Sequence, residues 1–132
     1  MSDSFIDTNV LLYLAGTEIR KAERAELLLR EGGIISVQVL NELANVTQRK
    51  LRFPWQDTLS FLDNVRGLLN VVPVDEAVHD EGLRISRRYG LSVYDGMIAG
   101  AALVCGCDRL WSEDMHHGLT IAGKLRIQNP FA

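Results

Sequence analysis

The sequence predicts an α/β fold in which helices cover a central, mostly parallel sheet, and three observations lead to this prediction. Short apolar runs that are typical of buried strands alternate along the chain with longer segments of helical periodicity. The 132 residues match the usual size of one domain, and they contain no repeat or linker, so we expect a single domain over residues 1–132. The hydrophobic share of 47% is typical of a globular protein.

The N-terminal half is expected to contain two strands and four helices. Residues 18–30 place alanine and leucine at helical spacing between charged residues, which indicates an amphipathic helix that Gly32-Gly33 ends. Ser36 suits the N-cap of the next helix, and Pro54 is favoured in the first turn of the following one. The expected strands are residues 4–7 and 34–35, and the expected helices are residues 10–14, 18–30, 37–51 and 55–69.

The C-terminal half continues the alternation. Pro73 lacks a backbone donor, so the strand that contains it is expected at a sheet edge or to end there. The helix over residues 93–105 is rich in alanine and glycine and must pack closely on a neighbour. The expected strands are residues 71–74, 109–111 and one or two short strands within 119–127, and the expected helices are residues 75–88 and 93–105.

Three aspartates occupy positions where a parallel sheet binds ligands, beyond the carboxyl ends of its strands. Asp7 follows the first strand, Asp114 follows the strand over residues 109–111, and Asp95 lies in the first turn of a helix. Each also has a structural interpretation. Asp7 could cap a helix, Ser92 and Asp95 match a capping box, and Asp114 could cap a turn.

Glu42 is the most informative acid. The apolar stripe of its helix consists of Val39, Leu43 and Val46. Glu42 lies within this stripe, so we expect it to face inward, where a carboxylate needs compensation by a buried arginine or by a bound cation. If all four acids converge on one sheet edge, their repulsion favours cation binding, and oxygen ligands select Mg²⁺ or Mn²⁺.

Composition and charge limit the possible functions and locations of the protein. The net charge of −3, from 14 basic and 17 acidic residues, argues against a protein that simply coats nucleic acid, although the charge becomes +1 once the four acids are set aside. No apolar run is long enough to span a membrane, and residues 1–5 do not resemble a signal peptide, so we expect a cytoplasmic protein without a membrane partner. Cys105 and Cys107 are expected to be free thiols.

Other polar and aromatic residues are expected to have structural or solvent-exposed roles. His116-His117 is interpreted as a solvated turn, and Glu113 should point away from its neighbour Asp114. Trp55 is assigned to the core, with a groove that contacts a partner chain as the alternative. The basic clusters, Arg49-Lys50-Arg52 and Arg84-Arg87-Arg88, are interpreted as solvated helix faces.

Taken in order, the motifs resemble the PIN domain family, in particular the VapC-type toxins of prokaryotic type II toxin–antitoxin modules. The resemblance covers nearly the whole chain and depends on Glu42 together with Phe5-Ile6-Asp7-Thr8-Asn9, Tyr94-Asp95-Gly96-Met97-Ile98-Ala99, Leu110-Trp111-Ser112-Glu113-Asp114-Met115 and the closing Asn129-Pro130-Phe131. One departure is Gly96, where the family very often has alanine, and this glycine is expected to loosen the helix turn.

The resemblance implies a PIN-like, Rossmann-like α/β/α sandwich and Mg²⁺- or Mn²⁺-dependent endonucleolytic cleavage of tRNA, rRNA or mRNA. It implies a homodimer and an inhibitory antitoxin as partners. By position, Asp7, Glu42, Asp95 and Asp114 match the acidic quartet of the family, with Asp7 and Asp95 as the expected direct metal ligands. Asn9 and Ser112 match polar positions that help to hold the site.

Three other functions are weighed against this one. A non-catalytic PIN-like scaffold that binds RNA or protein would be expected to have lost site acids, and all four are present. A phosphatase on a Rossmann-like sheet would carry Asp-x-Asp after the first strand, where this chain has Asn9. A single-stranded DNA nuclease would use the same chemistry and remains an alternative.

Overall fold

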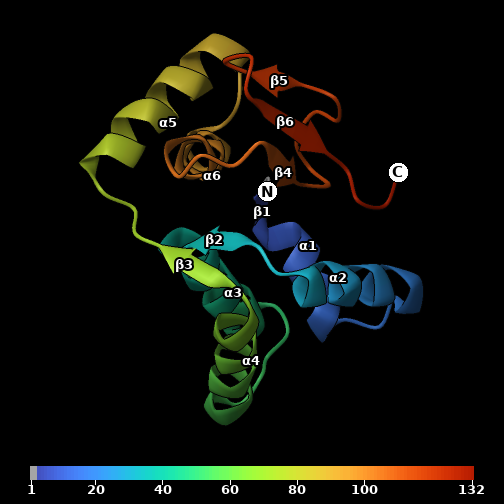
Figure 1. Ribbon diagram of the computed structural model, residues 1–132. Coiled ribbons are helices and arrows are strands. Elements are labelled where there is room, and N and C mark those ends of the chain that lie inside the picture. Colours follow the sequence, from blue (N-terminus) through green and yellow to red (C-terminus); the bar gives the residue numbers. More distant parts are fainter. Residues whose placement is uncertain (1–2) are drawn as a thin grey trace.

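The structure, a computed structural model, describes residues 3–132, and within them six strands form one sheet (Figure 1). The strands are β1 Ser4–Ile6, β2 Ile34–Ser36, β3 Asn70–Val72, β4 Arg109–Trp111, β5 Thr120–Ile121 and β6 Leu125–Gln128. The helices are α1 Thr8–Leu12, the 3₁₀ helix η1 Tyr13–Ala15, α2 Ile19–Glu31, α3 Val37–Arg49, α4 Trp55–Leu68, α5 Glu76–Tyr89 and α6 Val93–Val104. Residues 1 and 2 belong to the segment that the sequence predicts not to be a signal peptide, and they lie outside the described residues.

The strand order is β3-β2-β1-β4-β6-β5, and every neighbouring pair is parallel except the antiparallel β5–β6 hairpin. Helices α1 to α4 cover one face of the sheet, and α5 and α6 cover the other (Figure 1). The predicted α/β fold with a mostly parallel sheet is confirmed. The strand that precedes Pro73 lies at the sheet edge, as the missing backbone donor suggested.

The central strand is buried on both faces because helices cover both sides of the sheet. Phe5 and Ile6, which point to opposite faces of β1, are both 0% exposed. The strand ends one residue earlier than expected because Asp7 has become the N-cap of α1, which starts at Thr8. This short passage from strand to helix places the Asp7 side chain at the carboxyl edge of the sheet.

The assignment of Trp55 to the core was wrong. Its side chain is 65% exposed, although Pro54 introduces α4 as expected. The buried residues of α4 are Thr58 and Val65, so Trp55 at the first position of the helix is turned away from the core. Among residues 3–132, no helix is long and apolar enough to cross a membrane.

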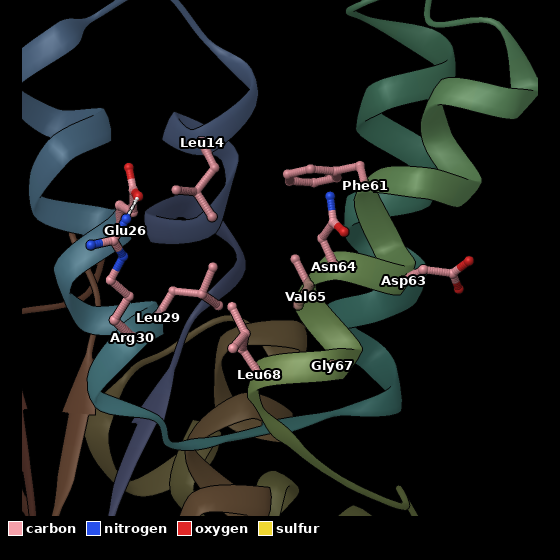
Figure 2. Close-up of a pocket in the computed structure, with 10 residues that line it drawn as sticks. All are labelled: Leu14, Glu26, Leu29, Arg30, Phe61, Asp63, Asn64, Val65, Gly67 and Leu68. Carbon is pink, nitrogen blue, oxygen red and sulfur yellow. Dashed lines mark hydrogen bonds and ion pairs between the residues drawn. The ribbon is translucent and has the colours of Figure 1, made fainter.

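A groove of about 600 Å³ separates α2 from α4 (Figure 2). Leu14, Leu29, Phe61 and Leu68 point into it from the two sides, and Leu68 is 54% exposed. An ion pair between Glu26 and Arg30, with 2.5 Å between Oε1 and Nη2, lies at its border. This groove contains none of the four candidate site acids.

Helices α5 and α6 approach each other at three glycines. A Cβ atom at Gly96 would lie 1.8 Å from Ser86 Oγ and 2.6 Å from the backbone oxygen of Gly82. A Cβ atom at Gly100 would lie 2.9 Å from the backbone nitrogen of Gly82. The expectation that Gly96 loosens its helix turn was therefore wrong, because this glycine packs against α5 where a side chain would have no room.

Replacing Gly96 with alanine is expected to lower the free energy of unfolding by about 1–3 kcal/mol in urea denaturation, since the added methyl group forces the two helix backbones apart. Gly67→Ala is the matched control, because a Cβ at Gly67 in α4 meets no atom within 4 Å. This control should raise stability by about 0.5–1 kcal/mol through its helix propensity. A Gly96→Ala variant as stable as the unmodified protein would contradict the proposed role of the close contact.

Candidate active site

Asp7 is the most buried of the four acids, with 3% of its surface exposed. Its Oδ1 accepts a hydrogen bond from the backbone N–H of Thr8 at 2.7 Å. Its Oδ2 accepts from Ser112 Oγ at 2.8 Å and from Asn9 Nδ2 at 3.0 Å. The carboxylate therefore caps α1 and also joins the end of β1 to the segment that follows β4.

Burial raises the pKa of the Asp7 carboxyl from 3.8 to about 7. Hydrogen bonds from Ser112 and Thr8 favour the ionised form and act in the opposite direction. The negative charges of Asp95 and Glu42 raise the pKa further. Asp7 thus lies in a position where a neighbouring positive charge would be strongly favourable.

Glu42 is half-buried on α3, beside Val39 and Leu43, which are 0% exposed. Its Oε1 accepts a hydrogen bond from Thr8 Oγ1, and its Oε2 accepts one from Gln38 Nε2 at 3.2 Å. Within residues 3–132, neutral donors rather than an arginine therefore hold the Glu42 carboxylate.

Asp95 lies in the first turn of α6, where its backbone N–H donates to Ser92 Oγ at 3.1 Å, so the predicted N-cap is present. Burial raises the pKa of the Asp95 carboxyl, a side-chain hydrogen bond with Ser92 opposes this, and the charges of Asp114 and Glu42 add to the rise.

Asp114 is exposed. The turn after β4 is capped by Ser112, whose Oγ accepts the N–H of Met115 at 3.2 Å.

The four acids come from α3, α6 and two strand ends and line one pocket of about 290 Å³, which we call the acidic pocket. Its lining is Asp7, Thr8, Asn9, Leu12, Glu42, Asn45, Val46, Asp95 and Asp114. Within residues 3–132, no group of three or more His, Cys, Asp or Glu side chains is close enough to form a ready-made metal site. The acids therefore share a pocket and influence one another electrostatically, without being drawn together to ligand distances.

Donor chemistry at the acidic pocket fits a hard divalent cation. A carboxylate offers about four lone pairs, and Asp7 uses one on Oδ1 and two on Oδ2, so Oδ1 retains acceptor capacity. Each oxygen of Glu42 also accepts one hydrogen bond from its neighbours. Oxygen-only donors with several negative charges are the ligands that Mg²⁺ and Mn²⁺ prefer.

A hydrogen-bond network leads outward from Asp7 through Asn9. Asn9 Nδ2 donates to Asp7 and, at 3.4 Å, to Ser112 Oγ, while its Oδ1 accepts the backbone N–H of Glu113 at 3.1 Å. The Glu113 carboxylate accepts from Lys21 Nζ at 2.5 Å and from the Tyr13 hydroxyl. This arrangement fixes the segment that carries Asp114 relative to β1.

The pKa of the Glu113 carboxyl agrees with its contacts to Lys21 and Tyr13. Burial alone would raise the pKa of its carboxyl, but hydrogen bonds from Lys21 and Tyr13 hold that pKa below its usual range. Glu113 points away from the acidic pocket, in agreement with the expectation that it lies apart from Asp114.

The remaining side chains considered in the sequence lie outside the acidic pocket. His116 and His117 are exposed, and His117 Nδ1 accepts the N–H of Asn129 at 2.9 Å. Cys105 and Cys107 are free thiols, as expected, with their sulfur atoms 3.5 Å apart. The two basic clusters are exposed, which agrees with solvated helix faces; they consist of Arg49, Lys50 and Arg52 and of Arg84, Arg87 and Arg88.

Sequence reasoning overlooked several residues that hold the acids. Gln38 precedes Glu42 by four positions on one helix, and this spacing could have identified it. Thr8 could have been noticed as the residue between Asp7 and Asn9. Tyr13 and Lys21 could not have been found, because they are 100 and 92 positions away from Glu113 along the chain.

The fold and the acidic pocket define a class of protein, a Rossmann-like α/β domain with acids at the carboxyl edge of a parallel sheet. The model of the PIN domain family matches residues 4–118. With most of its length matched, this chain belongs to the PIN domain family, and the resemblance noted in the sequence is confirmed.

Solved structures extend the likeness over the whole fold. A toxin–antitoxin complex from Klebsiella pneumoniae has a chain with 18% identity and a TM-score of 0.71, covering 97% of this chain and 98% of that chain. VapBC from Salmonella typhimurium, bound to DNA, has 24% identity, a TM-score of 0.70 and coverage of 98% and 99%. VapC20 from Mycobacterium tuberculosis, a Sarcin-Ricin loop cleaving toxin, has 16% identity, a TM-score of 0.69 and coverage of 85% and 90%. At these identities the likeness establishes the fold, and comparison with curated proteins gave no match.

Metal-free Asp7→Asn is expected to be more stable than the unmodified metal-free protein at pH 8. The folded state holds the Asp7 proton up to about pH 7, whereas the unfolded state releases it near the ordinary value of 3.8. Stability should therefore fall as pH rises from about 4 to about 7, by a few kcal/mol at about 1.4 kcal/mol per pKa unit. The amide cannot ionise, so the variant should lack this loss while keeping an N-cap.

The measurement is urea denaturation in EDTA between pH 4 and pH 8. Asp63→Asn, which removes an exposed carboxylate from α4, is the control and should follow the pH dependence of the unmodified protein. A stability difference between Asp7→Asn and the unmodified protein that is independent of pH would show that Asp7 acts as a cap alone.

Proposed function

We propose that this chain is a metal-dependent endoribonuclease that acts as the toxin of a toxin–antitoxin module. The observation that carries the proposal is the meeting of Asp7, Glu42, Asp95 and Asp114 in one pocket, where burial and mutual repulsion raise the pKa of Asp7 and of Asp95. Such an arrangement is costly in a protein without a cation to compensate it. Membership of the PIN domain family supports the same proposal.

In this proposal Asp7 and Asp95 bind Mg²⁺ or Mn²⁺ directly, and Glu42 and Asp114 complete the site through water or hold a second ion. Held by these residues, a cation would supply polarisation of a phosphate oxygen and a lower pKa for the attacking water, whose new bond to phosphorus would replace the bond to the departing 3′-oxygen. Ser112 and Asn9 orient the Asp7 carboxylate, and Thr8 orients Glu42. No side chain need act as a nucleophile.

The proposed substrate is a tRNA, rRNA or mRNA strand, and the proposed partners are an antitoxin and a second copy of the chain in a cytoplasmic homodimer. The solved complexes with a similar fold support the antitoxin, since they are toxin–antitoxin assemblies. The groove between α2 and α4 supports a protein partner, because its leucine and phenylalanine side chains offer an apolar surface (Figure 2).

The purified chain is expected to cleave a labelled single-stranded RNA with Mg²⁺ or Mn²⁺ and to be inactive in EDTA. Asp7→Asn and Asp95→Asn should reduce cleavage to background, and Ser112→Ala should reduce it roughly 10- to 100-fold through loss of orientation at Asp7. Mn²⁺ binding followed by calorimetry should weaken in parallel, because these variants lose ligands or their support.

Asp63→Asn is the matched control, since it removes an acid of the same type outside the acidic pocket and should retain full activity. A DNA strand of the same sequence distinguishes a ribonuclease from a single-stranded DNA nuclease. RNA cleavage that persists in EDTA with Asp7→Asn would contradict the proposed mechanism.

A further inference from the structure

The position of Asp114 depends on the chain segment that carries it. Asp7 is 3% exposed and has three hydrogen-bond donors around it, whereas Asp114 is exposed. Residues 112–119, between β4 and β5, form neither a helix nor a strand, so no regular element holds Asp114 in place. Side chains from other elements instead contact Glu113, the residue directly before Asp114.

The side chains that hold Glu113 form a cluster, which we call the Lys21 clamp and which consists of Tyr13, Lys21, Glu113 and Phe131. Lys21 Nζ donates to Glu113 Oε2 at 2.5 Å and to the Tyr13 hydroxyl at 3.1 Å. The Tyr13 hydroxyl donates to Glu113 Oε1, so both carboxylate oxygens are bound. Lys21 Nζ also lies 4.8 Å from the centre of the Tyr13 ring and 5.3 Å from that of the Phe131 ring. Donors from η1 and α2 therefore hold Glu113.

The Lys21–Glu113 ion pair differs from the Glu26–Arg30 ion pair of the same helix. The side chains of Lys21 and Glu113 are 33% and 22% exposed, and those of Arg30 and Glu26 are 70% and 51% exposed. Exposed pairs contribute little, because solvent screens them and two flexible side chains must be ordered. Lys21 is already ordered by a second acceptor and two aromatic rings, so less of this entropy is lost when it binds Glu113.

A second basic residue of α2 contacts the same segment. The Arg24 guanidinium lies 5.4 Å from the centre of the Trp111 ring. Lys21 and Arg24 are three residues apart, so they lie on one face of the helix. This face of α2 therefore contacts Trp111 and Glu113, the two neighbours of Ser112 in the chain.

We propose that Lys21 is a positioning residue of the acidic pocket, which holds Glu113 so that Asp114 faces the other acids and a divalent cation binds more tightly. This inference rests on the proposed function, which places the cation in the acidic pocket. Adjacent Cα atoms are about 3.8 Å apart, so a displacement of Glu113 also displaces Asp114. A segment that is ordered before the cation arrives loses less entropy on binding. Lys21 does not line the pocket, so it acts through Glu113.

The experiment measures Mn²⁺ binding to the full chain by isothermal titration calorimetry. Lys21→Met keeps the apolar stem of the side chain but removes its charge and donors, and it should weaken Mn²⁺ binding roughly tenfold, as loss of a ligand's supporting contact does. Lys21→Arg retains the charge and donors and should restore most of the affinity. Arg30→Met is the matched control, because it breaks the Glu26 ion pair on the same helix outside the acidic pocket, and it should bind Mn²⁺ as the unmodified protein does.

A double-mutant cycle with Asp114→Asn shows whether Lys21 acts through Asp114. If it does, adding Lys21→Met to Asp114→Asn should change the Mn²⁺ affinity by less than about twofold, the usual uncertainty of such cycles. A loss of the same size in both backgrounds would overturn the proposal, because Lys21 would then act through the general stability of the fold.

Hydrogen exchange of the metal-free protein measures the positioning itself. The backbone N–H of Glu113 is bound to Asn9 Oδ1 at 3.1 Å. A peptide that contains residues 112–116 should exchange faster in Lys21→Met than in the unmodified protein, whereas peptides from α5 should exchange at the same rate. Unchanged exchange over residues 112–116 would overturn the proposal.

Tyr13→Phe repeats both measurements with a smaller change, in case Lys21→Met does not fold. It removes the hydroxyl that Lys21 and Glu113 share and keeps the ring beside Phe131. It should weaken Mn²⁺ binding by a smaller factor and speed exchange over residues 112–116. Affinity and exchange equal to those of the unmodified protein would contradict the role of the Lys21 clamp.

The outcomes separate this inference from the proposed function. Cation-dependent RNA cleavage with an Mn²⁺ affinity that Lys21→Met leaves unchanged would keep the nuclease proposal and refute the role of Lys21. Mn²⁺ binding that depends on Lys21 through Asp114, in a chain that cleaves neither RNA nor DNA, would support the role of Lys21 and refute the nuclease proposal.

Discussion

The burial of the Asp7 carboxylate is the constraint on which the rest of the site depends. This side chain is 3% exposed, and three donors surround it, one from the following residue, one from Asn9 and one from Ser112 beyond β4. These bonds hold the carboxyl ends of the two central strands in register at the point where the acidic pocket opens. The same burial raises the pKa of Asp7, so a nearby cation would stabilise the ionised form of the group that organises the site.

The second constraint is the close contact of α5 and α6, which positions Asp95. Gly82, Gly96 and Gly100 lie where the two helix backbones meet, and side chains there would separate them. Gly96 directly follows Asp95, so the contact that secures the helix start also secures the carboxylate. The packing of α5 on α6 therefore also fixes the position of a carboxylate at the carboxyl edge of the sheet.

The carboxyl edge of the sheet divides into two surfaces of different chemistry. Strands β1 and β4 lead to acids, and strands β2 and β3 lead to an apolar cleft with one exposed aromatic side chain. Gln38 contacts both through one amide group.

The sequence by itself determined the order of strands and helices, the mostly parallel sheet and the four acids, because these follow from hydrophobic periodicity and from residues next to strand ends. Tertiary structure decided the environment of those acids. Thr8 and Gln38, not an arginine, hold Glu42, and Gly96 is a packing residue, not a flexible one. Trp55 at the start of α4 and the bonds from Tyr13 and Lys21 to Glu113 were likewise beyond prediction. The physical reason is that burial and hydrogen-bond partners arise between segments distant in sequence, whereas local patterns report only which face of an element is apolar.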